Sequence, residues 1–220
     1  MSGRRWQQID PLLKKSLLLG EDDLCFYYLV RTSGGFSASL ANSRIENFKK
    51  DPARFRDRPD VWRYKTGAVS EFANDLRGFL VDMLPPGHRT VALVPMPTSK
   101  PRSHEHYDSR LVDMCRQAID GYAGDAVLED VLDVAEAIPA AHEGGSRDVC
   151  TLMSRMTVGQ LSCRPSVVFL VDDVITTGAH YLACKQMIQR VCVGVPIVGV
   201  FLAVHKSDMV DYDYDFTDSF

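Results

Sequence analysis

The sequence lacks any pair of cysteines in the CxxC spacing that zinc ribbons and many redox sites use. Its six cysteines are scattered along the chain, at Cys25, Cys115, Cys150, Cys163, Cys184 and Cys192. Such scatter fits neither a zinc module nor a disulfide framework. We therefore expect structural thiols and a purified protein without stoichiometric zinc.

Long apolar runs are also missing, and a membrane span would need about 20 such residues. The first 23 residues pair a short apolar stretch with Lys14 and Lys15, so they lack the continuous core and the cleavage site of a signal peptide. We expect a cytoplasmic protein with no membrane partner.

Positive charges are fewer than negative charges overall. The chain has 25 Lys and Arg but 29 Asp and Glu, which gives a net charge of −4. A surface with this net charge does not attract nucleic acid. Nucleic acid therefore stays a possible partner only for a local basic patch. Residues 44–65 are the local exception, with an excess of four positive charges. They are either a solvated connector or a patch for a polyanion.

Alternating strand and helix patterns run through the rest of the chain and predict a parallel α/β sheet. The N-terminal part predicts a hairpin from strands 24–30 and 36–40. Helices are expected at 68–84, from 111, and at 181–191; strands at 90–96, 127–134, 167–171 and 197–204; and a loop at 138–147. We expect three segments: 1–63, a hood-like hairpin and basic connector; 64–206, the α/β core; and 207–220, an acidic tail.

The most informative stretch is VVFLVDDVITTGAH, residues 167–180. A buried strand delivers Asp172 and Asp173 to the sheet edge where α/β proteins bind ligands. The turn Thr176-Thr177-Gly178 then opens a helix, whose unpaired N–H groups and positive dipole end favour a phosphate. Acids beside such a cradle fit a sugar phosphate, with carboxylates on the ribose diol. The alternative is that the acids only cap the helix and the turn is ordinary.

No GxxxxGK[ST] or GxGxxG pattern exists, which argues against a Walker A loop and a dinucleotide fingerprint. The stretch instead closely resembles the phosphoribosyl pyrophosphate motif of type I phosphoribosyltransferases. Tyr64-Lys65 with its helix, Val91 to Pro97, and Tyr107 to Arg110 resemble the ComF-like branch of that family. The resemblance covers about residues 64–204 and implies the family's parallel sheet flanked by helices.

The resemblance also implies site residues. Those for ribose and 5-phosphate are Asp172, Asp173, Val174, Ile175, Thr176, Thr177, Gly178, Ala179 and His180. Those for pyrophosphate are Thr98, Ser99, Lys100 and Arg102, and Arg147 belongs to a lid. The catalytic set is Asp172, Asp173, Lys100 and Arg102, although Lys100, Arg102 and Arg147 also fit ordinary solvated loops. Mg²⁺ is implied as cofactor, held through the substrate, with Asp172 and Asp173 as candidate ligands.

Three departures from the family pattern matter. The zinc module of ComF proteins is missing, since Cys25 stands alone, and His180 replaces the usual Thr. Thr176 stands where 6-oxopurine salvage enzymes carry an Asp, so hypoxanthine and guanine are not supported as acceptors.

Two functions stay open. One is transfer of phosphoribose from phosphoribosyl pyrophosphate to a small nucleobase-like acceptor. The other is a non-catalytic module that senses a nucleotide or phosphoribosyl pyrophosphate and regulates a partner or nucleic acid. A homodimer stays an option in both.

Overall fold

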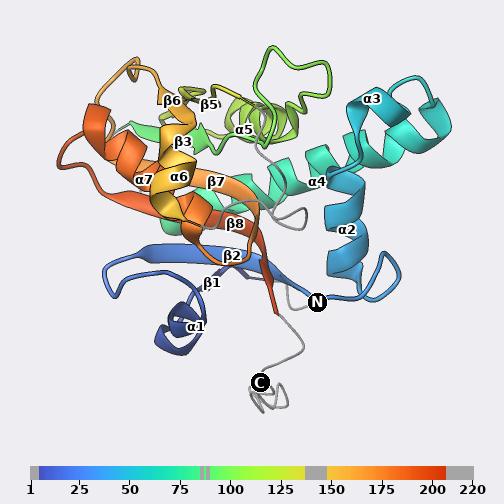
Figure 1. The fold of residues 1–220 in the computed structure, drawn as a ribbon, viewed down its shortest axis with the longest axis horizontal. Coiled ribbons are helices and arrows are strands. Elements are labelled where there is room, and N and C mark those ends of the chain that lie inside the picture. Colours follow the sequence, from blue (N-terminus) through green and yellow to red (C-terminus); the bar gives the residue numbers. More distant parts are fainter. Residues whose placement is uncertain (1–4, 85–86, 88–89, 137–147, 207–220) are drawn as a thin grey trace.

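A six-stranded sheet forms the centre of the protein in the computed structural model, which describes residues 5–84, 87, 90–136 and 148–206. The strands are β1 (Gln7–Gln8), β2 (Leu24–Arg31), β3 (Val91–Pro95), β4 (Ala126–Leu128), β7 (Val167–Ile175) and β8 (Ile197–His205). Their order is β1-β2-β8-β7-β3-β4, and every neighbouring pair is parallel except β1 with β2. The predicted mixed α/β fold with a mostly parallel sheet is confirmed (Figure 1).

Helices cover both faces of this sheet and bury two apolar clusters against it. They are α1 (Pro11–Ser16), α2 (Leu40–Phe48), α3 (Pro52–Phe55), α4 (Pro59–Met83), α5 (Arg110–Asp120), α6 (Val149–Ser154) and α7 (Ala179–Val191). Helices α4 and α5 share one cluster with the strands, and α7 packs in the other. A separate antiparallel pair joins β5 (Leu132–Val134) to β6 (Met156–Val158).

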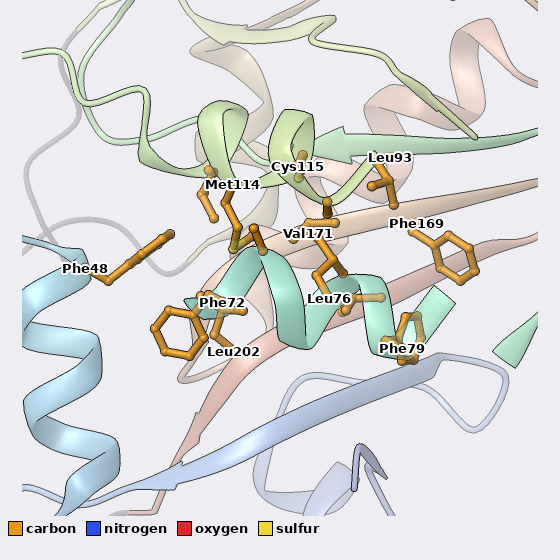
Figure 2. Packing of buried hydrophobic residues seen from close by; sticks show 14 of the residues in the cluster. Phe48, Phe72, Leu76, Phe79, Leu93, Met114, Cys115, Phe169, Val171 and Leu202 are labelled. Carbon is orange, nitrogen blue, oxygen red and sulfur yellow. The ribbon is translucent and has the colours of Figure 1, made fainter. Parts of the chain in front are cut away.

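Helix α4 illustrates why the apolar spacing predicts its position. Phe72, Leu76 and Phe79 recur at i, i+4 and i+7, so they share one face and are fully buried. Figure 2 shows these side chains packed among Phe169 of β7 and Leu202 of β8. The rings of Phe79 and Phe169 meet edge to face, with centroids 5.5 Å apart.

The predicted N-terminal hairpin is wrong. Residues 36–40 form no strand, and β2 pairs in parallel with β8 and antiparallel only with the two-residue β1. The reason lies in the turn, where the Asn42 side-chain amide donates to the carbonyls of Thr32, Gly34 and Gly35. Ser39 accepts from the Asn42 N–H and caps α2, so this turn leads into a helix.

Two further expectations also need correction. The single strand predicted at 127–134 is divided into β4 and β5, which belong to different sheets. Between them, buried Glu129 accepts from the backbone N–H of Ser162 at 2.8 Å, which turns the chain away from the main sheet. Residues 44–65 contain the end of α2, α3 and the start of α4, so they are helical and more than a connector.

The segment boundaries at residues 63 and 206 stay predictions, and the expected loop 138–147 lies wholly outside the described residues. None of the described helices is both long enough and apolar enough to cross a membrane.

Candidate functional site

The candidate site lies where β7 ends and α7 begins. Strand β7 continues through Ile175, past the two acids, and the loop from Thr176 to Gly178 leads into the 13-residue α7. Gly178 has φ +83°, a left-handed conformation that favours glycine, and it forms the N-cap of α7. The Thr177 hydroxyl accepts from the Ala179 N–H at 3.4 Å. The predicted loop and helix start are therefore present, with the helix N-terminus beside Asp172.

The segment between α1 and β2 packs against this loop. The Leu18 N–H donates to the Thr177 carbonyl at 2.7 Å. A Cβ on Gly178 would lie 3.2 Å from Cδ2 of Leu19. The N-terminal part of the chain thus fixes the loop that would cradle a phosphate, a contact that no local sequence pattern reveals.

Asp172 lies on the α7 side of the sheet, with 14% of its side chain exposed. Its Oδ1 accepts from the Asp173 N–H at 2.7 Å, and its Oδ2 lies 3.3 Å from Nδ1 of His180. Burial opposes protonation of the His180 imidazole, but the adjacent Cys184 thiol and the Asp172 carboxylate outweigh burial and raise the pKa of His180 well above its usual value. The site therefore pairs the Asp172 carboxyl group with the His180 ring at the start of α7.

Asp173 faces the opposite side of the sheet, because successive side chains alternate along a strand. Its Oδ2 accepts from Nη2 and Nε of Arg110 at 2.5 and 3.1 Å, and its Oδ1 lies 3.2 Å from Nζ of Lys49. Only 5% of this side chain is exposed. Burial alone would raise the pKa of Asp173, but Lys49 and Arg110 outweigh burial and hold it below its usual range. Both oxygens of Asp173 are thus committed to cations.

The ion pairs continue from Arg110 into the interior. Its Nη1 donates to Oδ2 of Asp108 at 2.9 Å, and Nζ of Lys65 donates to the same oxygen at 2.7 Å. Burial of Lys65 lowers its pKa, although Asp108 counteracts this effect. The family resemblance points to Lys65 and to the segment containing Asp108 and Arg110, but the sequence does not predict that they form this network. The sequence feature that could have indicated the network is the pair of opposite charges, Asp108 and Arg110, at the start of the strongly amphipathic helix α5.

The predicted pyrophosphate residues follow β3, but Arg102 is engaged elsewhere. Its Nη2 donates to Oδ1 and the carbonyl of Asp130 at 2.7 and 2.8 Å, and to the Leu132 carbonyl at 2.9 Å. Arg102 therefore fastens its loop to the connection between β4 and β5. The Thr98 hydroxyl donates to the Lys100 carbonyl at 3.2 Å.

The cavity beside this loop, lined in part by Thr98 and Arg102, has a volume of about 10 Å³, room for one water molecule. Ser99 is exposed, Lys100 is half-buried, and Arg147 lies outside the described residues.

The structure thus brings Asp172 together with residues 174–180, places Asp173 beside them but on the other face, and turns Arg102 away. Among the described residues, no three His, Cys, Asp or Glu side chains come close enough together to hold a metal ion. Of the two acids, Asp172 is the better fit as a ligand that substrate-bound Mg²⁺ would share. Both oxygens of Asp173 already face cations, whereas only Oδ2 of Asp172 lies near a basic side chain, that of His180.

No protein-family model matches the sequence, and no curated protein matches it either. Among solved structures, the chain is similar to adenine phosphoribosyltransferase from Trypanosoma brucei, with 15% identity over 82% of this chain and 83% of that chain, and a TM-score of 0.41. It is also similar to hypoxanthine phosphoribosyltransferase from Staphylococcus aureus, with 13% identity over 64% and 68% of the two chains, and a TM-score of 0.34. At these values the similarity shows neither the family nor the function of this chain.

Proposed function

We propose that this chain is a phosphoribosyltransferase, which transfers 5-phosphoribose from phosphoribosyl pyrophosphate to a nucleobase-like acceptor and releases pyrophosphate. The observation that carries the proposal is the junction of β7 and α7. There, the Asp172 carboxylate lies one short loop away from a left-handed Gly178 at the start of a long helix. A carboxylate and a phosphate cradle in this arrangement match the two ends of a ribose 5-phosphate.

Each part of the junction has a role in substrate binding. The hydroxyls of Thr176 and Thr177 and the backbone N–H groups of residues 178–180 hold the 5-phosphate, which the positive end of the α7 dipole also stabilises. Val174 and Ile175 set the spacing between cradle and carboxylate. Asp172 accepts hydrogen bonds from the ribose diol, each charge-assisted bond contributing about 1.5 to 3 kcal/mol.

The reaction breaks the bond between the anomeric carbon and the pyrophosphate oxygen and forms a bond from that carbon to an acceptor nitrogen. The bonding electron pair leaves with pyrophosphate, and the acceptor gives its proton to solvent. The ribose carries oxocarbenium character in the transition state, as in glycoside hydrolysis. The Asp172 carboxylate, close to that ring, stabilises its positive charge. Mg²⁺, bound mainly by substrate oxygens and by Asp172, would neutralise charge on pyrophosphate.

A second candidate is a non-catalytic sensor of a nucleotide or phosphoribosyl pyrophosphate. Two observations favour it. Asp173 is held by Arg110 and Lys49, and Arg102 is held by Asp130 and the Leu132 carbonyl. A sensor of nucleoside monophosphates needs only Asp172 and the phosphate cradle, which this arrangement leaves in place.

The test is the single variant Asp172→Asn. Loss of the ribose acceptor should weaken ribose 5-phosphate binding about tenfold or more, measured by calorimetry. Base-dependent release of pyrophosphate should fall by about 10²-fold or more, measured with a panel of bases. Asp60→Asn is the control, because Asp60 lies at the start of α4 in an exposed pair with Arg58.

The outcomes separate the two candidates. If wild type binds ribose 5-phosphate but releases no pyrophosphate with any base, the sensor replaces the enzyme as the proposed function. Unchanged affinity in Asp172→Asn, or wild type that binds neither ribose 5-phosphate nor phosphoribosyl pyrophosphate, would refute the site itself.

A further inference from the structure

Lys49 is a cation that the N-terminal part of the chain delivers to the candidate site. It directly follows α2, and its Nζ lies 3.2 Å from Oδ1 of Asp173 on β7. Its side chain is 42% exposed, whereas that of Asp173 is 5% exposed. Lys49 therefore lies at the boundary between the buried ion pairs and solvent.

Lys65 on α4 fixes the backbone on both sides of Lys49. The Lys65 ammonium donates to the carbonyls of Phe48 and Lys50, each at 2.8 Å, and these two residues flank Lys49. The third bond of that ammonium goes to Asp108 at 2.7 Å. Since Lys65 is buried and all three of its N–H groups are engaged, the turn that carries Lys49 is anchored to the core.

Charge balance makes Lys49 different from the other cations in this network. Asp173 and Asp108 carry two negative charges, and Arg110 and Lys65 carry two positive charges, so these four buried groups are already neutral. With Lys49 added, the five groups carry a net charge of +1. An ammonium has three N–H donors, and the bond to Asp173 uses one of them.

Such a cation is suited to an anion that arrives at the carboxyl edge of β7. Asp173 directly follows Asp172, the residue to which we assign the ribose. Arg102, to which the family resemblance gives a pyrophosphate role, instead donates to Oδ1 of Asp130 and to the Leu132 carbonyl. A polyanionic leaving group at this edge would therefore find Lys49 as a partly exposed cation on an anchored turn.

We propose that Lys49 contacts the pyrophosphate group of phosphoribosyl pyrophosphate. This inference rests on the proposed function and deepens it. It also gives the basic segment 44–65 a role in binding a small polyanion and makes the N-terminal part of the chain a contributor to the site.

The experiment compares two ligands on three proteins. Calorimetry would measure the affinity of phosphoribosyl pyrophosphate with Mg²⁺, and of ribose 5-phosphate, for wild type, Lys49→Gln and Lys50→Gln. Lys50 is the matched control, because it is the next residue but its ammonium bonds to Asn47 and lies 5.6 Å from the Phe36 ring centroid. Lys49→Gln should weaken phosphoribosyl pyrophosphate binding about tenfold or more. It should change ribose 5-phosphate affinity less than about twofold, and Lys50→Gln should change neither.

Lys49→Arg, which keeps the charge, should retain phosphoribosyl pyrophosphate affinity to within about threefold. Equal losses for both ligands, or no loss for either, would overturn the role of Lys49 while the proposed function stands. Wild type that binds neither ligand would refute the proposed function and this inference together.

Discussion

Asp172 and Asp173 are adjacent in sequence but meet different surroundings, because β7 remains extended through Ile175 and its side chains alternate. The sequence predicts that both acids reach the sheet edge. It does not predict that Asp173 turns toward Arg110 and Lys49, because these partners lie 63 and 124 positions away. Local pattern places a carboxylate on a strand, whereas its charge partners depend on how distant helices pack.

Asp173→Asn should destabilise the fold, since it leaves Arg110 buried without its main counter-charge. Breaking a buried pair on one side costs about 3 to 5 kcal/mol, measured here as the free energy of unfolding in urea. Asp60→Asn is the control, because its pair with Arg58 is exposed and such changes stay within about 0.5 kcal/mol. An Asp173→Asn protein as stable as wild type would contradict the burial of this charge.

The same carboxylate also sets a pH dependence. Its pKa is lower in the folded protein than in the unfolded chain, so its stabilisation is complete above about pH 4, the usual Asp value. This stabilisation is lost as the pH falls through the folded pKa. Wild type should therefore lose free energy of unfolding below about pH 4 more steeply than Asp173→Asn does.

Among the elements, those with helical apolar spacing or a continuous apolar run were predictable. Helices α4, α5 and α7 follow from the spacing, and strands β2, β3, β7 and β8 follow from the runs, although α4 begins nine residues earlier than expected, at Pro59. Helix α2, at Leu40–Phe48, was not predicted. Elements such as α1, α6 and β6 have six residues or fewer, too few for a period to be visible. Their positions depend on packing against the rest of the fold.

Gly178→Ala tests the loop between β7 and α7 as a unit. At φ +83° an alanine is strained by about 1 to 2 kcal/mol, and its Cβ would press on Leu19 at 3.2 Å. We expect a loss of stability, measured by thermal unfolding, together with weaker ribose 5-phosphate binding.

Gly194→Ala provides the comparison, because Gly194 has φ +75° but no atom within 4 Å of the added Cβ. It should lose stability from backbone strain alone and keep its affinity for ribose 5-phosphate. Equal affinity for ribose 5-phosphate in the two variants would show that the loop between β7 and α7 does not bind the phosphate.

On the scale of the whole molecule, the N-terminal part is built into the central sheet. Strand β2 lies between β1 and β8, and Leu17 and Ile9 are buried with side chains of α7. From the sequence we expected residues 1–63 to form a hood-like segment beside the core. The sequence does not predict that β2 joins the central sheet, because its partner strand β8 is far away in the chain.

Deleting residues 1–63 should therefore abolish cooperative folding of the remainder. Strand β8 would lose its neighbour β2, and its apolar residues would lie at an open sheet edge. Soluble yield and thermal unfolding of residues 64–206 would measure this effect. Residues 1–206, without the acidic tail, are the control and should unfold like the full chain. A cooperative transition in residues 64–206 alone would instead support the predicted boundary at residue 63.

The pairing of β2 with β8 also has a consequence during synthesis. Leu24 is the register partner of Val198, 174 positions later in the chain. A ribosome that adds about 5 to 20 residues per second needs about 9 to 35 s to cover that distance. Throughout this time β2 has been made while its long parallel partner has not. The nascent chain therefore carries an apolar strand with an unpaired edge, and chaperone binding to residues 24–31 before release is the expected result.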